Sequence, residues 1–95
     1  IAIGVPAGQV GDIRPRSGMA ASGITVANAP GTIDPGYNGE LIVMLINHGK
    51  NHLLWEAGDR IAQLVLTYTN TQPFIEVDQL DQTERGDGGF GSTGH

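Results

Sequence analysis

The sequence predicts an all-β domain, and three observations support this. Apolar and β-branched segments recur along the chain, and turn-forming glycines, prolines and asparagines interrupt them about every 8–12 residues. Only one short stretch has helical character. The 95 residues suffice for a single domain near the small end for a self-sufficient core. These features together predict a small jelly-roll-like β sandwich with one short helical turn.

The first half of the chain predicts short strands broken by tight turns. The opening residues alternate as a strand does and lead into the turn at 6–8. Further extended segments are expected at 10–14 and 24–26, with the helical turn at 17–21 between them, closed by Gly23. The density of proline and glycine from 28 to 39 predicts a hairpin with a tight tip.

The second half predicts four further strands and an arm. Residues 41–46 are continuously apolar, so this strand should be covered on both faces, and another subunit is the expected second cover. Strands are also expected at 53–55, 60–68 and, as an outer strand, 74–77. From 78 the chain is acidic and then glycine-rich, and residues 80–95 are expected to form a mobile C-terminal arm.

Composition excludes several classes of function. The formal net charge of −5 argues against sequence-independent binding of nucleic acid. The chain has no cysteine, so disulfides and thiolate metal sites are impossible, and no apolar run approaches the length that spans a bilayer. Three of the five cationic residues lie in segments with candidate phosphate-binding chemistry: Arg16, Arg60 and Arg85.

The most informative of these segments is 85–94, near the C-terminus. Five glycines allow close approach of the backbone to a ligand, and an arginine, an aromatic ring and a Ser-Thr pair are spaced among them. Such groups suit a polyphosphate and a base. A Gly-x-Gly-x-x-Gly pattern at 86–91 is weak evidence for a dinucleotide site, because no βαβ unit surrounds it. The alternative is a disordered glycine-rich terminus.

Three upstream segments, at 15–20, 28–40 and 58–64, precede this one. In this order the four segments closely resemble motifs two to five of the trimeric dUTPase family, the dUTP diphosphatases. The family's first motif is missing. Residues 1–95 are therefore expected to form a single dUTPase-like domain that is N-terminally incomplete relative to the family, either because upstream residues were removed or not included or because the version is naturally short.

The resemblance implies hydrolysis of dUTP to dUMP and pyrophosphate, which keeps uracil out of DNA and supplies dUMP for dTMP synthesis. It implies a homotrimer whose sites are shared between subunits, with no nucleic acid or membrane as partner. Mg²⁺ would be held mainly by the substrate phosphates and water rather than by protein ligands. The expected location is the cytoplasm, or the host cytoplasm for a viral or phage protein.

The resemblance also assigns residues. Asp34 would activate the attacking water at the α-phosphate, as a carboxylate can; the alternative is an Asx-turn residue. Tyr37 would lie under the deoxyribose and exclude a 2′-hydroxyl, and Asn28 with Gly31 and Thr32 would read uracil. The expected phosphate contacts are Arg16, Ser17, Gly18 and Gln63. The tail would supply Arg85, Phe90 (over the uracil), Gly91, Ser92 and Thr93.

Two other functions remain open at this point. One is a catalytically impaired, dUTPase-like module that binds a nucleotide or a protein, which tight binding without turnover would favour. The other is a dCTP deaminase relative, which shares the fold but matches the segments at 32–37 and 85–94 less well. A metal pair at His48 and His52 has the right spacing for a helix, but Gly49 and Asn51 indicate a loop.

Overall fold

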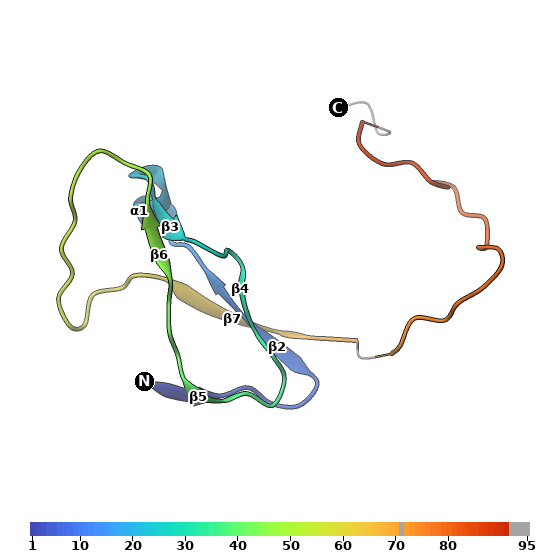
Figure 1. Ribbon diagram of the computed structural model, residues 1–95, viewed down its shortest axis with the longest axis horizontal. Helices are drawn as coiled ribbons and strands as arrows, with labels where there is room; N and C mark the ends of the chain where they lie inside the picture. Colours follow the sequence, from blue (N-terminus) through green and yellow to red (C-terminus); the bar gives the residue numbers. More distant parts are fainter. Residues whose placement is uncertain (71, 92–95) are drawn as a thin grey trace.

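The computed structural model describes residues 1–70 and 72–91, and within them the chain is almost entirely β-structure and coil (Figure 1). This confirms the predicted all-β class. The elements, in chain order, are β1 (Ala2–Gly4), β2 (Gln9–Arg14), α1 (Ser17–Ala21), β3 (Ile24–Val26), β4 (Gly31–Ile33), β5 (Asn38–Glu40), β6 (Leu45–Asn47) and β7 (Gln63–Tyr68).

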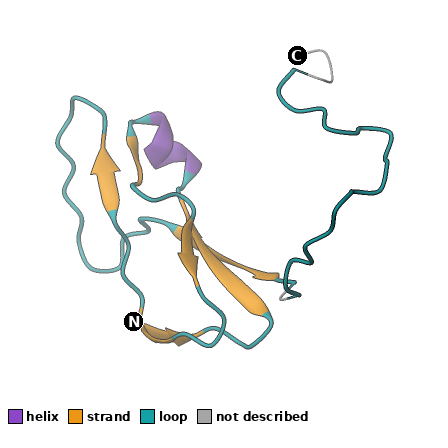
Figure 2. Ribbon diagram, turned by 45° about the vertical axis from the view of Figure 1, so that its right-hand side comes forward, coloured by secondary structure: helices purple, strands orange, loops and turns teal. Residues whose placement is uncertain are grey.

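The strands form three small antiparallel sheets (Figure 2). The largest has the order β4-β2-β7, with Gly11 opposite both Ile33 and Leu66. The other two are the pairs β1-β5 and β3-β6. Because opposite residues share a face, the face of β2 that carries Gly11 and Ile13 also carries the β7 leucines, Leu64 and Leu66.

The hairpin expected across 28–39 is wrong. The chain does turn there, but β4 pairs with β2 and β5 pairs with β1, so the two strands lie in different sheets. The strands expected at 53–55 and 74–77 are also wrong, since both segments are coil. Strand-like composition cannot form a strand without a neighbouring edge to receive its hydrogen bonds.

The apolar stretch 41–46 is extended, but only its end enters β6. Its side chains alternate rather than being covered on both faces: Ile42 is 69% exposed and Met44 53%, while Leu41, Val43 and Leu45 are half-buried. One face of this segment is therefore open to solvent in the single chain.

The core of the single chain is small. The buried apolar side chains are Val5, Ile13, Ile24 and Val26. The radius of gyration is 18.6 Å, whereas a compact chain of this length should have about 12 Å. The chain leaves the sheets where β7 ends at Tyr68, and from residue 72 the described tail runs as coil apart from them (Figure 1). Within the described residues, no helix is long and apolar enough to cross a membrane.

Candidate functional site

A hollow of about 220 Å³ lies beside β4 and the turn that follows it. The side chains with candidate chemistry in its wall come from one continuous stretch of chain, 28–40. Apolar residues from β2 and from the segment after β5 complete the lining. The lining residues are Ile13, Asn28, Gly31, Thr32, Ile33, Asp34, Tyr37, Glu40, Leu41 and Ile42.

A tight turn places Asp34 at the edge of this hollow. The Tyr37 N–H donates to the Asp34 carbonyl over 3.1 Å, and Gly36 has φ of +82°. With proline at the second position and positive φ at the third, this is a type II turn. The buried Val5 anchors it, because its backbone exchanges hydrogen bonds with Gly36 and Tyr37. The Asp34 side chain is exposed while its backbone is fixed.

Tyr37 lies against the next strand. Its hydroxyl donates to the Glu40 carbonyl oxygen over 2.7 Å. A Cβ on Gly39 would stand only 2.8 Å from that hydroxyl and 3.0 Å from the ring carbon that bears it, so the ring rests directly on the glycine. The tyrosine is 41% exposed and one side of it borders the hollow.

The side chains of Asn28 and Thr32, which both line the hollow, make different contacts. The Asn28 amide packs over Gly31, where a Cβ would come within 3.3 Å of both its terminal atoms. The Thr32 hydroxyl, in β4, instead lies 3.5 Å from the carboxylate of Asp12, its partner in β2. Asp12 also lies 3.5 Å from the Arg14 guanidinium.

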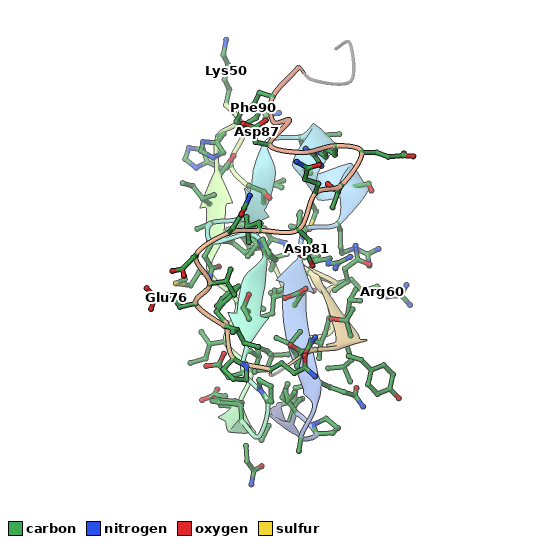
Figure 3. All side chains as sticks on the ribbon, turned by 90° about the vertical axis from the view of Figure 1, so that its right-hand side faces the viewer. Lys50, Arg60, Glu76, Asp81, Asp87 and Phe90 are labelled. Carbon is green, nitrogen blue, oxygen red and sulfur yellow. The ribbon has the colours of Figure 1, made fainter. Side chains whose placement is uncertain are left out.

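A second hollow of about 390 Å³ adjoins the first, and Ile13 and Leu41 line both. Its charged and polar lining residues are Arg16, Asp59, Arg60 and Gln63. Arg16 is half-buried, and the Arg60 side chain extends outward (Figure 3). Asp59 closes a turn by accepting the Glu56 N–H over 2.9 Å. The lining therefore includes two arginines and one aspartate, with the Arg60 side chain extending away from it.

The segment around Arg16 is held by a contact with β7. The Gln63 amide donates to the Pro15 carbonyl oxygen over 2.9 Å. Arg16 then caps α1 through its backbone, whose carbonyl accepts the Ala20 N–H over 2.9 Å, with no capping side chain. Ser17 and Gly18 begin the helix and are exposed, and the structure does not place them in the lining of the second hollow.

The described tail runs apart from the sheets in the single chain (Figure 1), and none of its described residues lines either hollow. Phe90 is fully exposed. Two local turns shape the segment, in which Gly86 N–H donates to the Thr83 carbonyl and Arg85 Nε donates to the Gly88 carbonyl over 2.7 Å. Gly91 is exposed, and the predictions for Ser92 and Thr93 lie outside the described residues.

Sequence reasoning missed the apolar floor that the two hollows share. The sequence identifies Ile13 and Leu41 only as strand residues, and no signal within one segment shows that Ile13 lies opposite Gly31, because that depends on the register of β2 and β4. The sequence places Arg60 in a segment with candidate phosphate-binding chemistry but assigns it no role. Within the part of the chain that the structure describes, no three His, Cys, Asp or Glu side chains gather as metal ligands.

Comparisons with known proteins agree on one family. The family model described as dUTPase matches residues 1–94. A curated deoxyuridine 5'-triphosphate nucleotidohydrolase of Syntrophotalea carbinolica is 48% identical over 95 residues, covering 99% of this chain and 65% of the relative. That of Nocardia farcinica is 52% identical over 96 residues, covering 99% and 58%. The chain thus spans about three fifths of the length of these relatives.

Among solved structures, the dUTPase of Staphylococcus bacteriophage 80alpha with dUPNHPP superposes with a TM-score of 0.81. The two are 28% identical, and the match covers 99% of this chain and 72% of the phage chain. A match of this coverage includes the segments that line the two hollows.

Proposed function

The chain belongs to the dUTPase family, and on that premise we propose that the protein hydrolyses dUTP to dUMP and pyrophosphate. One observation supports this most: a hollow with a carboxylate, an aromatic ring and an amide adjoins a hollow with two arginines. The first suits a nucleoside and the water that attacks its phosphate, and the second suits phosphates.

In the proposed mechanism Asp34 accepts a proton from a water molecule as that water's oxygen bonds to the α-phosphorus. The bond from the α-phosphorus to the oxygen bridging to the β-phosphate breaks, and pyrophosphate leaves with the bonding electrons. Asp34 suits this role because the type II turn fixes its backbone while the carboxylate stays exposed at the edge of the hollow. Arg16 would contribute charge that offsets the triphosphate.

Selection of the nucleoside would depend on the first hollow. Tyr37 rests on Gly39, and this fixed ring would leave no room for a 2′-hydroxyl. Asn28, with the backbone of Gly31 and Thr32, would satisfy the edge of uracil. A site with fixed hydrogen-bond partners discriminates strongly against bases that cannot match them.

A divalent ion fits this site as part of the substrate complex. Mg²⁺ would be held mostly by triphosphate oxygens and water, as this ion often is in nucleotide sites. The ion would neutralise phosphate charge when bound.

The proposal includes a homotrimer with shared sites. The small core and the large radius of gyration support it, because the single chain leaves many apolar side chains uncovered. The first hollow, at about 220 Å³, is also small for a ligand of this size, since pockets for drug-sized ligands have about 300–1,000 Å³. Tails from neighbouring chains would bring Arg85 and Phe90 to the two hollows and complete them.

The test is pyrophosphate release from dUTP with Mg²⁺, with dCTP, dTTP and UTP as parallel substrates. Selective turnover of dUTP is the expected result. Ammonia release from dCTP would instead identify a deaminase. Tight binding of dUpNHpp without turnover of dUTP would identify a module that only binds the nucleotide.

A further inference from the structure

The helical turn α1 has no buried residue, although it follows the arginine that lines the second hollow. Its one half-buried residue is Met19, so core packing contributes little to its position and the contacts at its two ends matter more. At the N-terminal end, Gln63 binds the Pro15 carbonyl. At the C-terminal end, the chain leaving α1 meets the loop after β6 (Figure 1).

That second contact is unusually close. The His48 N–H donates to the Gly23 carbonyl over 2.7 Å, which extends the β3-β6 pairing by one step. A Cβ on Gly23 would lie 2.5 Å from the Gly49 nitrogen, and a Cβ on Gly49 would overlap the carbonyl oxygen of Ser22, the residue that caps α1. The two backbones can meet only because both positions are glycine.

The loop side of the contact is itself braced. The Asn47 side chain accepts the Gly49 N–H over 2.8 Å and donates to the Asn51 carbonyl over 2.9 Å. Gly49 is thus held by Asn47, which is paired with Ile24 in the neighbouring strand. The contact at this glycine therefore fixes the position of α1 relative to the β3-β6 sheet.

We propose that Gly49 is a positioning residue for phosphate binding: its contact with Ser22 and Gly23 sets α1, and through α1 the guanidinium of Arg16. This inference rests on the proposed function, since it takes the hollow with Arg16 as the phosphate site. The α1 helix is only about 7.5 Å long at 1.5 Å per residue. A shift of its C-terminal end should therefore also shift Arg16 at its N-terminal end, because so short a helix has few residues that could absorb the movement.

The experiment compares Gly49→Ala with Gly4→Ala, a matched change in β1 where the added Cβ meets its nearest neighbour at an ordinary 3.8 Å. Affinity is measured for dUpNHpp and for deoxyuridine, which lacks phosphates. Gly49→Ala should weaken dUpNHpp binding about tenfold and change deoxyuridine binding less than about twofold, because the base hollow is untouched. Gly4→Ala should change neither affinity.

Equal weakening of both ligands, or of neither, would overturn the proposal, since a general loss of structure lowers both affinities. If Gly49→Ala does not fold, Asn47→Ala tests the proposal instead, because it removes the two hydrogen bonds that hold the loop without adding volume. It should weaken dUpNHpp about threefold and leave deoxyuridine unchanged, and an unchanged ratio overturns the proposal. Failure of the wild-type protein to turn over dUTP or bind dUpNHpp would count against the proposed function instead.

Discussion

The side chain of Gln63, at the start of β7, donates a hydrogen bond of 2.9 Å to the carbonyl oxygen of Pro15. This contact joins two segments that are 48 residues apart in the sequence. Arg14 and Gln63 are opposite each other in the β2-β7 pair, so this bond extends the pairing by one residue and holds Pro15, which precedes Arg16. Gln63 and Arg16 both line the second hollow, and in the proposed function the second N–H of Gln63 would contact a phosphate.

Gln63→Glu should weaken dUpNHpp binding by tenfold or more. The carboxylate keeps the shape of the side chain but cannot donate to Pro15, and it adds negative charge facing the triphosphate. Stability should change by less than about 1 kcal/mol, because the bond is exposed and water can replace it. Calorimetric titration and urea unfolding provide the two measurements. Gln9→Glu, at the opposite end of β2, is the control and should leave affinity unchanged.

The contact between Tyr37 and Gly39 predicts a change in sugar specificity. Gly39→Ala must displace the tyrosine ring, since the new Cβ would lie 2.8 Å from its hydroxyl. The ratio of kcat/KM for dUTP to that for UTP should fall about tenfold or more. Tyr37→Phe keeps the ring on the glycine and should retain the ratio within about threefold. A ratio that falls equally in both variants would show that the hydroxyl, rather than the ring position, excludes ribose.

Phe90→Ala should separate binding from stability. The ring is fully exposed in the single chain, so its removal should leave the melting temperature unchanged. If the ring covers uracil in the assembled protein, KM for dUTP should rise about tenfold, as stacking energies of 1–3 kcal/mol imply. Thermal unfolding and steady-state kinetics test this. A melting temperature that falls along with activity would mean that Phe90 packs between subunits rather than against the ligand.

Shared sites predict that two impaired variants restore each other when turnover is measured at dUTP concentrations below KM, where Phe90→Ala should retain about a tenth of wild-type activity and Asp34→Asn almost none. Mixed assemblies of Asp34→Asn and Phe90→Ala chains, formed by refolding equal amounts together, would contain sites with an intact Asp34 from one chain and an intact tail from another. Random assembly should give about a quarter of wild-type activity. Activity no higher than the average of the two separate variants would indicate that each chain completes its own site.

Much of the first half of the fold could be predicted from sequence because its signals are local. The helical turn at 17–21 and the extended segment at 24–26 match the structure, and the turn ends where Gly23 takes φ of +93°. The strand expected at 10–14 begins one residue earlier, at Gln9. Proline and glycine specify these boundaries through backbone conformations that need no distant contact.

The predictions that were wrong concern segments whose structure depends on which strands pair with each other. Residues 28–39 contain every local signal of a hairpin, yet Val5 ties the turn to β1 and the flanking strands pair elsewhere. Phe74 and Ile75 have strand-like composition but are 106% and 82% exposed, with no edge beside them. No pattern within a segment says which edge will receive it.

In the candidate site, too, local features could be predicted from the sequence and contacts between distant segments could not. The sequence could group Asn28, Asp34 and Tyr37 because a short continuous stretch brings them to one hollow. It could not show that Gln63 binds Pro15, or that Ile13 and Leu41 join the two hollows, since those contacts depend on the sheet register. The placement of Arg85 and Phe90 over a ligand stays a prediction, because it requires a neighbouring chain.

The most direct test measures turnover of dUTP and binding of dUpNHpp by the wild-type protein and by Asp34→Asn. The wild type should release pyrophosphate, and the variant should lose about 10³-fold in kcat while binding the analogue within about threefold of wild type. Asparagine preserves the turn but cannot accept the proton of the attacking water. Undiminished turnover in Asp34→Asn, or a wild-type protein that binds the analogue without releasing pyrophosphate, would contradict Asp34-dependent dUTP hydrolysis.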